Sequence, residues 1–175
     1  MAGSLIKIDE EIVTSAVGSV TLGGTDWDSS YDVYMVKFEN VKPSTDNKDL
    51  YFQFTTSGTP DTSSNYDYAH KILRADTTFT NIGVTNTDKF TAVSGVGNAT
   101  GENANGVIYC FNFNNASEYS FLTVESTMRD RSAILVGEQG GAVHTVAQAC
   151  DGLNFDMSSG NIDTGSKFTL YGLKK

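Results

Sequence analysis

A strict two-residue alternation near the middle of the chain constrains its fold more than any other feature. Apolar and aromatic side chains fall at every second position, at Val107, Tyr109, Phe111 and Phe113. The intervening positions hold Ile108, Cys110 and Asn112. Successive side chains of a β-strand point to opposite faces of a sheet, so this pattern predicts a strand with one buried face. We expect Val107, Tyr109 and Phe111 to lie in the core or in a subunit contact.

Shorter runs of the same kind recur along the chain, separated by segments rich in Gly, Asn, Asp and Ser. They predict strands at 19–22, 31–41, 50–55, 66–74, 79–84, 89–93, 119–126, 132–136, 143–150 and 153–157, and a final strand after Gly165 on which Phe168, Leu170 and Gly172 alternate. Residues 94–105 read as a mobile loop and Gly137 to Gly141 as a turn. Further core or subunit contacts are expected at Phe52, Phe54, Leu122, Val124 and Phe168.

No long amphipathic helix interrupts these runs. A parallel α/β fold needs helices between its strands, so the pattern favours an all-β, jelly-roll-like β-sandwich of antiparallel strands. We expect one such domain over residues 1–175. The segment 1–18 is a candidate N-terminal arm, although its apolar residues also suit a strand pair.

Charge restricts the classes of partner. The chain carries 21 Asp and Glu against 12 Lys and Arg, a formal net charge of −9. Such a surface repels phosphates and keeps a protein soluble, so we expect no nucleic-acid binding. No apolar run reaches the length of a membrane span, and the opening residues lack the apolar core of a signal peptide. We therefore expect no membrane insertion and synthesis in a cytoplasm.

The two cysteines are Cys110 and Cys150. Cys110 lies within a predicted strand, which suggests a small buried side chain. Since nothing indicates an oxidising compartment, free thiols are favoured, although a disulfide between the two remains open.

Motifs for catalysis are lacking. His144 is close in sequence to Glu138, but no Gly-x-Ser-x-Gly elbow accompanies it, and His70 reads as a half-buried strand residue. The glycines are not followed by a helix, so they form no phosphate loop. We expect a protein that is not an enzyme, with no catalytic residue, no cofactor and no metal.

One turn is rich in both carboxylates and aromatic rings. The three carboxylates, Asp26, Asp28 and Asp32, are oxygen ligands of the kind that suits Ca²⁺, but the segment lacks the glycine and distal glutamate of an EF-hand loop. A solvated turn is the better interpretation. Asp26, Trp27, Asp28 and Tyr31 are also candidate glycan contacts, because a ring can stack on a sugar while carboxylates accept hydroxyl hydrogen bonds. The alternative is that these aromatic rings pack in the core or between subunits.

Several short patches carry a family resemblance. The chain opens with Met1-Ala-Gly-Ser-Leu-Ile-Lys-Ile8 and continues with Tyr31-Asp-Val-Tyr-Met-Val36 and Phe38. Gly140-Gly-Ala-Val-His-Thr-Val146, Gly152-Leu-Asn-Phe155 and Ser158-Ser-Gly-Asn-Ile162 precede the final Leu170-Tyr-Gly-Leu-Lys174. Together they resemble small virion proteins of tailed bacteriophages, including phages of marine cyanobacteria. The resemblance implies a jelly-roll-like virion component with no enzymatic role.

Three functions follow as hypotheses. The first is an accessory structural protein of the virion, such as a capsid decoration or knob protein or a short tail appendage, whose partners are capsid or tail proteins. The second is a receptor-binding module of a tail fibre that recognises host surface glycan, and the third is a small glycan-cleaving enzyme. The strands at 31–41 and 107–113 carry apolar side chains on both faces, so we also expect a homo-oligomer. The resemblance suggests a trimer.

Overall fold

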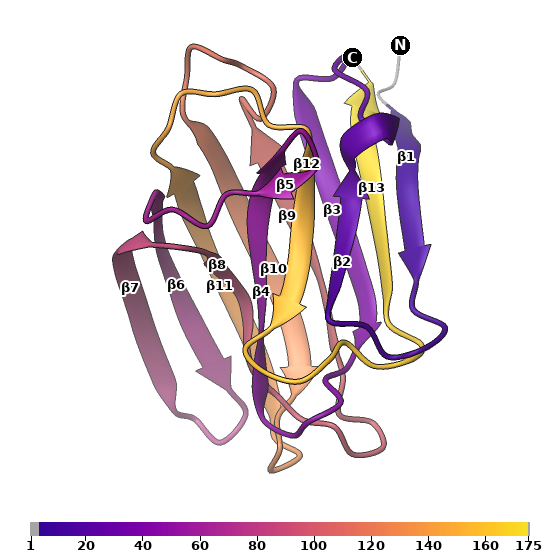
Figure 1. The fold of residues 1–175 in the computed structure, drawn as a ribbon. Helices are drawn as coiled ribbons and strands as arrows, with labels where there is room; N and C mark the ends of the chain where they lie inside the picture. The colour runs from indigo at the N-terminus through magenta and orange to yellow at the C-terminus, as the bar shows by residue number, and fades with distance from the viewer. Residues whose placement is uncertain (1–3, 175) are drawn as a thin grey trace.

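The computed structural model describes residues 4–174 and consists of two antiparallel sheets packed face to face (Figure 1). This arrangement confirms the predicted all-β sandwich. Helical structure in this part of the chain amounts to one 3₁₀ turn, η1 (Gly24–Asp26). No helix in residues 4–174 is long and apolar enough to cross a bilayer.

The strands are β1 (Ser4–Ile12), β2 (Ser19–Gly23), β3 (Val33–Val41), β4 (Lys48–Thr56), β5 (Thr59–Pro60), β6 (Tyr66–Arg74), β7 (Phe79–Thr87), β8 (Phe90–Val96), β9 (Ala104–Phe111), β10 (Ser120–Arg129), β11 (Leu135–His144), β12 (Gly152–Met157) and β13 (Lys167–Lys174).

Eight of these strands have the connectivity of a jelly roll. One sheet contains the order β1-β13-β3-β9, and the facing sheet contains β2-β12-β4 with β8 paired to β4. The chain changes sheet between β1 and β2, β2 and β3, β3 and β4, β8 and β9, and again from β12 to β13. The predicted jelly-roll-like sandwich is therefore present in its strand order.

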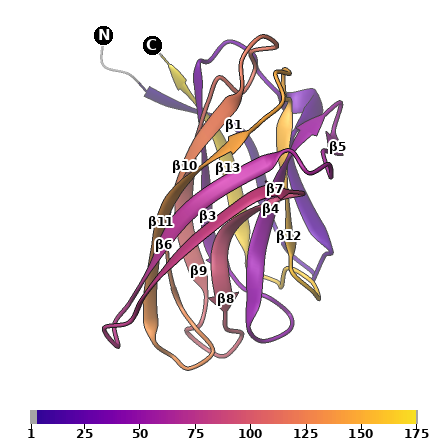
Figure 2. The same ribbon diagram turned by 90° about the vertical axis from the view of Figure 1, so that its left-hand side faces the viewer.

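Two insertions enlarge one sheet of the jelly roll. Strands β5 to β7 come between β4 and β8, and the hairpin β10–β11 comes between β9 and β12. Of these strands, β5 pairs with β4 in the facing sheet, and the others add the order β10-β11-β6-β7 beyond β9. This makes an eight-stranded sheet with β1 and β7 at its edges. Figure 2 shows this added half-sheet toward the viewer, with β6 and β7 crossing in front.

Aromatic rings fill the space between the sheets. Phe54 lies at the centre, with its ring centroid 4.5 Å from that of Phe113 and 5.5 Å from that of Phe90. Phe52 and Phe155 continue the cluster toward Phe168. Of the expected core residues, these are buried: Phe52, Phe54, Leu122, Val124 and Phe168. Burial of such rings from water supplies the main driving force for packing the two sheets.

Strand β9 is present, but the expectation that Val107, Tyr109 and Phe111 lie in the core is wrong, while their alternative role in a subunit contact stays a prediction. Ile108 and Cys110 point into the core, whereas Tyr109 and Phe111 point outward and are 36% and 38% exposed. Val107 shares their outward face and is half-buried. Alternation specifies the period of a strand and not which face meets the core. Both faces of β9 are apolar, so the neighbouring strands decide between them.

Three predicted boundaries are wrong. Residues 137–141 form the middle of β11, which pairs continuously with β10 from Leu135 to His144, so no turn is present there. Strand β8 extends to Val96 and β9 starts at Ala104, which shortens the predicted loop. The two strands predicted at 132–136 and 143–150 are instead the single strand β11, which covers Leu135 to His144. Glycine-rich sequence favours a turn locally, but Gly140 lies against the backbone of β6, an approach that requires a residue without Cβ.

The candidate N-terminal arm is mostly an edge strand. Residues 4–12 form β1, which pairs antiparallel with β13 along its length. The following residues also bond to the body of the protein, with the Val13 amide donating to the Ser166 carbonyl at 2.9 Å. Residues 1–3 lie outside the described part of the chain.

Both cysteines are buried free thiols, and burial raises the pKa of the Cys150 thiol to about 12.

Candidate functional site

The predicted glycan-contact turn is split between the core and the surface. The Trp27 ring stacks on Tyr34 with centroids 4.1 Å apart and lies 4.9 Å from the Phe113 ring. Its indole N–H is buried without a hydrogen-bond partner. Trp27 therefore packs against the core, which was the alternative interpretation, and Tyr34 covers one face of the ring that a sugar would need.

Among the acidic residues of this turn, Asp28 stabilises the turn itself. Asp26 ends η1 and is exposed. The Asp28 carboxylate accepts hydrogen bonds from the hydroxyl and the backbone amide of Ser30, and these bonds lower its pKa. No group of three or more His, Cys, Asp or Glu side chains in residues 4–174 is arranged to hold a metal ion.

Tyr31 differs from Trp27 because it borders an open hollow. This hollow has a volume of about 330 Å³ and is lined by Ser29, Tyr31, Asp32, Asn112, Phe113, Asn114 and Asn115. The side-chain amide of Asn114 donates to the Ser29 carbonyl at 3.0 Å, which ties the β9–β10 connection to the turn. The structure thus places Tyr31 beside polar side chains that are distant from it in sequence.

His144 is a structural residue. Its side chain is fully buried, and Nε2 lies 2.8 Å from Oδ2 of Asp61, which follows β5. Burial tends to raise the pKa of Asp61, but hydrogen bonds from Ser63, His144 and Asn65 outweigh it and hold that pKa at about 2. The pair fixes the loop between β5 and β6 to the core.

His70 and Glu138 form the second buried histidine–carboxylate pair. Nε2 of His70 lies 3.4 Å from the Glu138 carboxylate, and both side chains are almost fully buried. Burial raises the pKa of Glu138 to about 7 and lowers that of His70. The distance alone suggests an ion pair, but both pKa shifts favour neutral groups, and burial makes the neutral description the better one. The adjoining cavity measures about 10 Å³, room for one water molecule.

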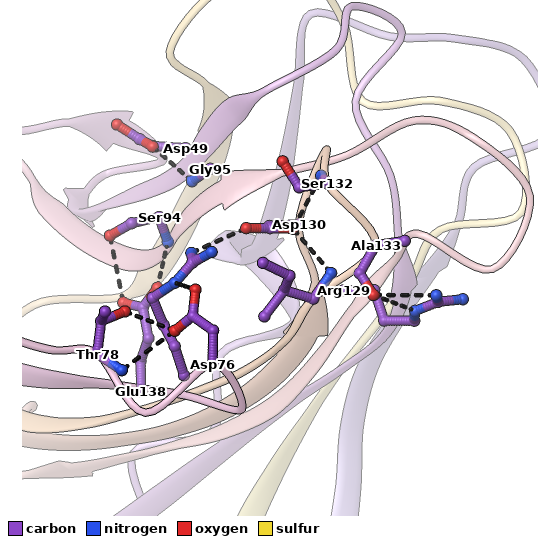
Figure 3. A network of polar contacts seen from close by, with 12 residues as sticks. Asp49, Asp76, Thr78, Ser94, Gly95, Arg129, Asp130, Ser132, Ala133 and Glu138 are labelled. Carbon is purple, nitrogen blue, oxygen red and sulfur yellow. Dashed lines mark hydrogen bonds and ion pairs between the residues drawn. The ribbon is translucent and has the colours of Figure 1, made fainter.

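The Glu138 carboxylate covers the free edge of β8. It accepts the Ser94 amide at 2.7 Å and the Ser94 hydroxyl at 3.2 Å, as Figure 3 shows. The Ser126 hydroxyl donates to the carbonyl of Ala92 in the same strand at 3.3 Å. Asp49 accepts the Gly95 amide at 2.7 Å. Side chains therefore satisfy backbone groups of β8 that no strand pairs.

A second polar network joins two turns at this end of the sandwich. Arg74 contacts Asp130 at 2.8 Å and Asp76 at 3.2 Å (Figure 3). Asp130 also accepts the amides of Ser132 and Ile134, both at 2.9 Å. These carboxylates bond to groups in the β6–β7 and β10–β11 turns, so the network stabilises the turns.

Aromatic side chains are exposed together on the outer face of the eight-stranded sheet. In the register of the sheet, Phe111 lies opposite both Val33 and Phe121, and Phe121 lies opposite Val143. Tyr109 lies two residues before Phe111 in β9 and therefore on the same face of the sheet. We call these five residues the outer aromatic patch. Phe121 is 49% exposed.

A shallow hollow of about 520 Å³ continues the outer aromatic patch toward β7. Gly141, Ala69 and Gly83 lie opposite one another across β11, β6 and β7, so small residues form its floor. Phe121, Val143 and Asp67 also line it. An aromatic wall beside a low floor provides space for a side chain or a ring from a partner.

Comparison with known proteins gives no identification. No family model matches the chain, and neither does any curated protein sequence or solved structure. Sequence reasoning missed the buried His70–Glu138 pair and did not place Phe121 and Val143 beside Phe111 in the outer aromatic patch. The apolar residues on both faces of β9 were the signal for the patch, whereas nothing in the sequence placed Glu138 beside Ser94.

Proposed function

We propose that this protein is a non-enzymatic structural component of a tailed-phage virion, an accessory surface protein of the capsid or a short tail appendage. It would be made in the host cytoplasm and then bind other virion proteins. The outer aromatic patch carries this proposal, because exposed aromatic residues that adjoin one another are typical of protein contacts. The resemblance of the terminal Leu170-Tyr-Gly-Leu-Lys174 segment to virion proteins supports the phage context.

Two observations support a role without catalysis. Both histidines are buried, each beside one carboxylate, and the cavity next to Glu138 has room for only one water molecule. Phe111 and Phe121, in contrast, are accessible and lie opposite each other. A jelly roll hosts many functions, so the fold alone does not decide this point.

Incorporation into particles tests the proposal. We expect the protein in purified virions of the phage that encodes it, detected by mass spectrometry and located by electron microscopy. The double variant Phe111→Ser/Phe121→Ser should fold but fail to enter particles, because it removes two rings of the outer aromatic patch. The matched control Lys37→Ser/Gln139→Ser changes the polar part of the same face and should be incorporated normally. Absence of the wild-type protein from purified particles would refute the virion role.

The receptor-binding alternative is favoured by one observation, the polar hollow beside Tyr31. A ring next to Asn112 and Asn114 suits a sugar, which offers an apolar face and hydroxyl groups. We expect a glycan binder to be retained on immobilised host surface polysaccharide and to lose retention in Tyr31→Ala, with little change in Trp27→Ala if the latter folds. Release of shortened sugars would instead indicate the glycan-cleaving hypothesis.

A further inference from the structure

The four edges of the two sheets differ in how they are protected. An exposed edge strand presents unpaired backbone N–H and C=O groups that can pair with another chain, and proteins usually block it. Among the described residues, β1 and β7 end the eight-stranded sheet. In the other sheet β2 forms one edge, and on the opposite edge β8 pairs with β4 beside β5, which has only two residues, the second a proline.

Three of these edges are blocked. Strand β1 carries Lys7, Asp9, Glu10 and Glu11 and is irregular between Lys7 and Asp9. Strand β2 is only five residues long, and its last amide, Gly23, bonds to the Asp9 carboxylate. Strand β8 is covered by Glu138 and Ser126, as described above. Charge, irregularity, shortness and side-chain cover are the usual means of protecting an edge.

The β7 edge lacks such protection over most of its length. Its sequence, Phe-Thr-Asn-Ile-Gly-Val-Thr-Asn-Thr, has no charged residue and no proline. None of its residues is buried, and the register shifts only near its end, where Asn86 has a φ of 54°. In Figure 1, β7 is the outermost strand on the left. The segment Phe79 to Thr85 is therefore a regular strand with an open side.

We propose that β7 pairs antiparallel with β7 of a second copy of this chain, about a two-fold axis at Ile82. This register places Ile82 opposite itself and Thr80 opposite Val84 on the inner face, and Phe79 opposite Thr85 on the outer face. Ile82 and Val84 are half-buried in the single chain, so pairing would complete their burial.

The lack of charge on this edge and a register that matches itself both fit a second copy as its occupant. Two chains of net charge −9 repel each other, so their contact must avoid opposed charges. The segment Phe79 to Thr85 contains none, and the proposed register is identical from both sides, as a two-fold interface requires. The resulting dimer has one continuous sheet through both subunits. It is a dimer rather than the trimer that the phage resemblance suggests, and it does not depend on the partner of the outer aromatic patch.

Sedimentation velocity on the full chain tests the pairing. We expect a reversible dimer whose fraction rises with concentration. Ile82→Lys sets two ammonium groups opposite each other and should raise the dissociation constant about tenfold or more. Thr80→Lys, at an exposed position, should also raise the dissociation constant. This variant tests the pairing if Ile82→Lys does not fold. The control Glu11→Lys, on the β1 edge, should leave the dimer intact, as should Phe111→Ser/Phe121→Ser.

Cross-linking tests the register. Directly opposed residues of antiparallel strands have Cα atoms about 4.5–5.5 Å apart, within the range of a disulfide. Ile82→Cys should therefore form an intermolecular disulfide under mild oxidation, whereas Thr80→Cys, opposite Val84, should not. The native cysteines are buried and do not interfere. A monomer at all concentrations, a dimer unaffected by both lysine variants, or better cross-linking by Thr80→Cys would overturn the proposal.

Discussion

Replacing one buried and one outward-facing phenylalanine tests how the strands are oriented. Phe54 points into the core between the two sheets, whereas Phe111 lies on the outer face of the eight-stranded sheet. Phe54 is fully buried among other rings, with Phe113 and Phe90 as near neighbours. Phe54→Ala should lower the free energy of unfolding by about 3–5 kcal/mol, from lost transfer energy and the cavity left behind. Phe111 is 38% exposed, so its replacement loses only about three fifths of the transfer energy of a fully buried ring. Water can fill the space that the ring leaves, so no cavity forms. Phe111→Ala should cost about 1–2 kcal/mol.

Urea denaturation followed by far-UV circular dichroism measures both values. With a slope of about 2 kcal/mol per molar urea, Phe54→Ala should lower the midpoint by about 2 M and Phe111→Ala by less than about 1 M. If the dependence of the unfolding free energy on urea concentration has the same slope in the wild type and both variants, the shifts in midpoint report changes in stability. If Phe111→Ala costs as much as Phe54→Ala, then the outward face of β9 is buried and the orientation of this strand described above is wrong.

Two further predictions concern the added half-sheet. In thermal unfolding, Gly140→Ala should destabilise the protein by about 1–3 kcal/mol, because the new Cβ would overlap the backbone of β6. The control Gly137→Ala should change stability little, because the atom nearest to its new Cβ is 3.8 Å away. The pKa of Glu138 is about 7 in the fold against an ordinary 4.5, so the folded state holds a proton that the unfolded state releases, and the free energy of unfolding should fall as pH rises between these values. Glu138→Gln removes this dependence. Between pH 4.5 and pH 8, the free energy of unfolding of the variant should therefore rise by about 3 kcal/mol relative to that of the wild type. Parallel curves of stability against pH for the two proteins would contradict the raised pKa.

The repeated two-residue period determined most of the secondary structure. Strands at 66–74 and 153–157 match the observed β6 and β12 closely, because apolar residues there alternate or run together between turn residues. The absence of helical periodicity was sufficient to predict an all-β sandwich. Errors occurred where local composition and tertiary contact disagree, as at Gly140, which reads as a turn but lies within β11.

Tertiary structure alone decided which face of each strand is buried and which polar groups meet. The period places Tyr109 and Ile108 on opposite faces of β9, but only the facing sheet makes the Ile108 side the core. Glu138 and Ser94 are brought together because two insertions extend one sheet beside β8, a pairing that no local pattern encodes. The open edge at β7 likewise depends on strand order. Sequence specifies each strand's alternation through local geometry, whereas burial, edges and sites depend on contacts between segments that are distant along the chain.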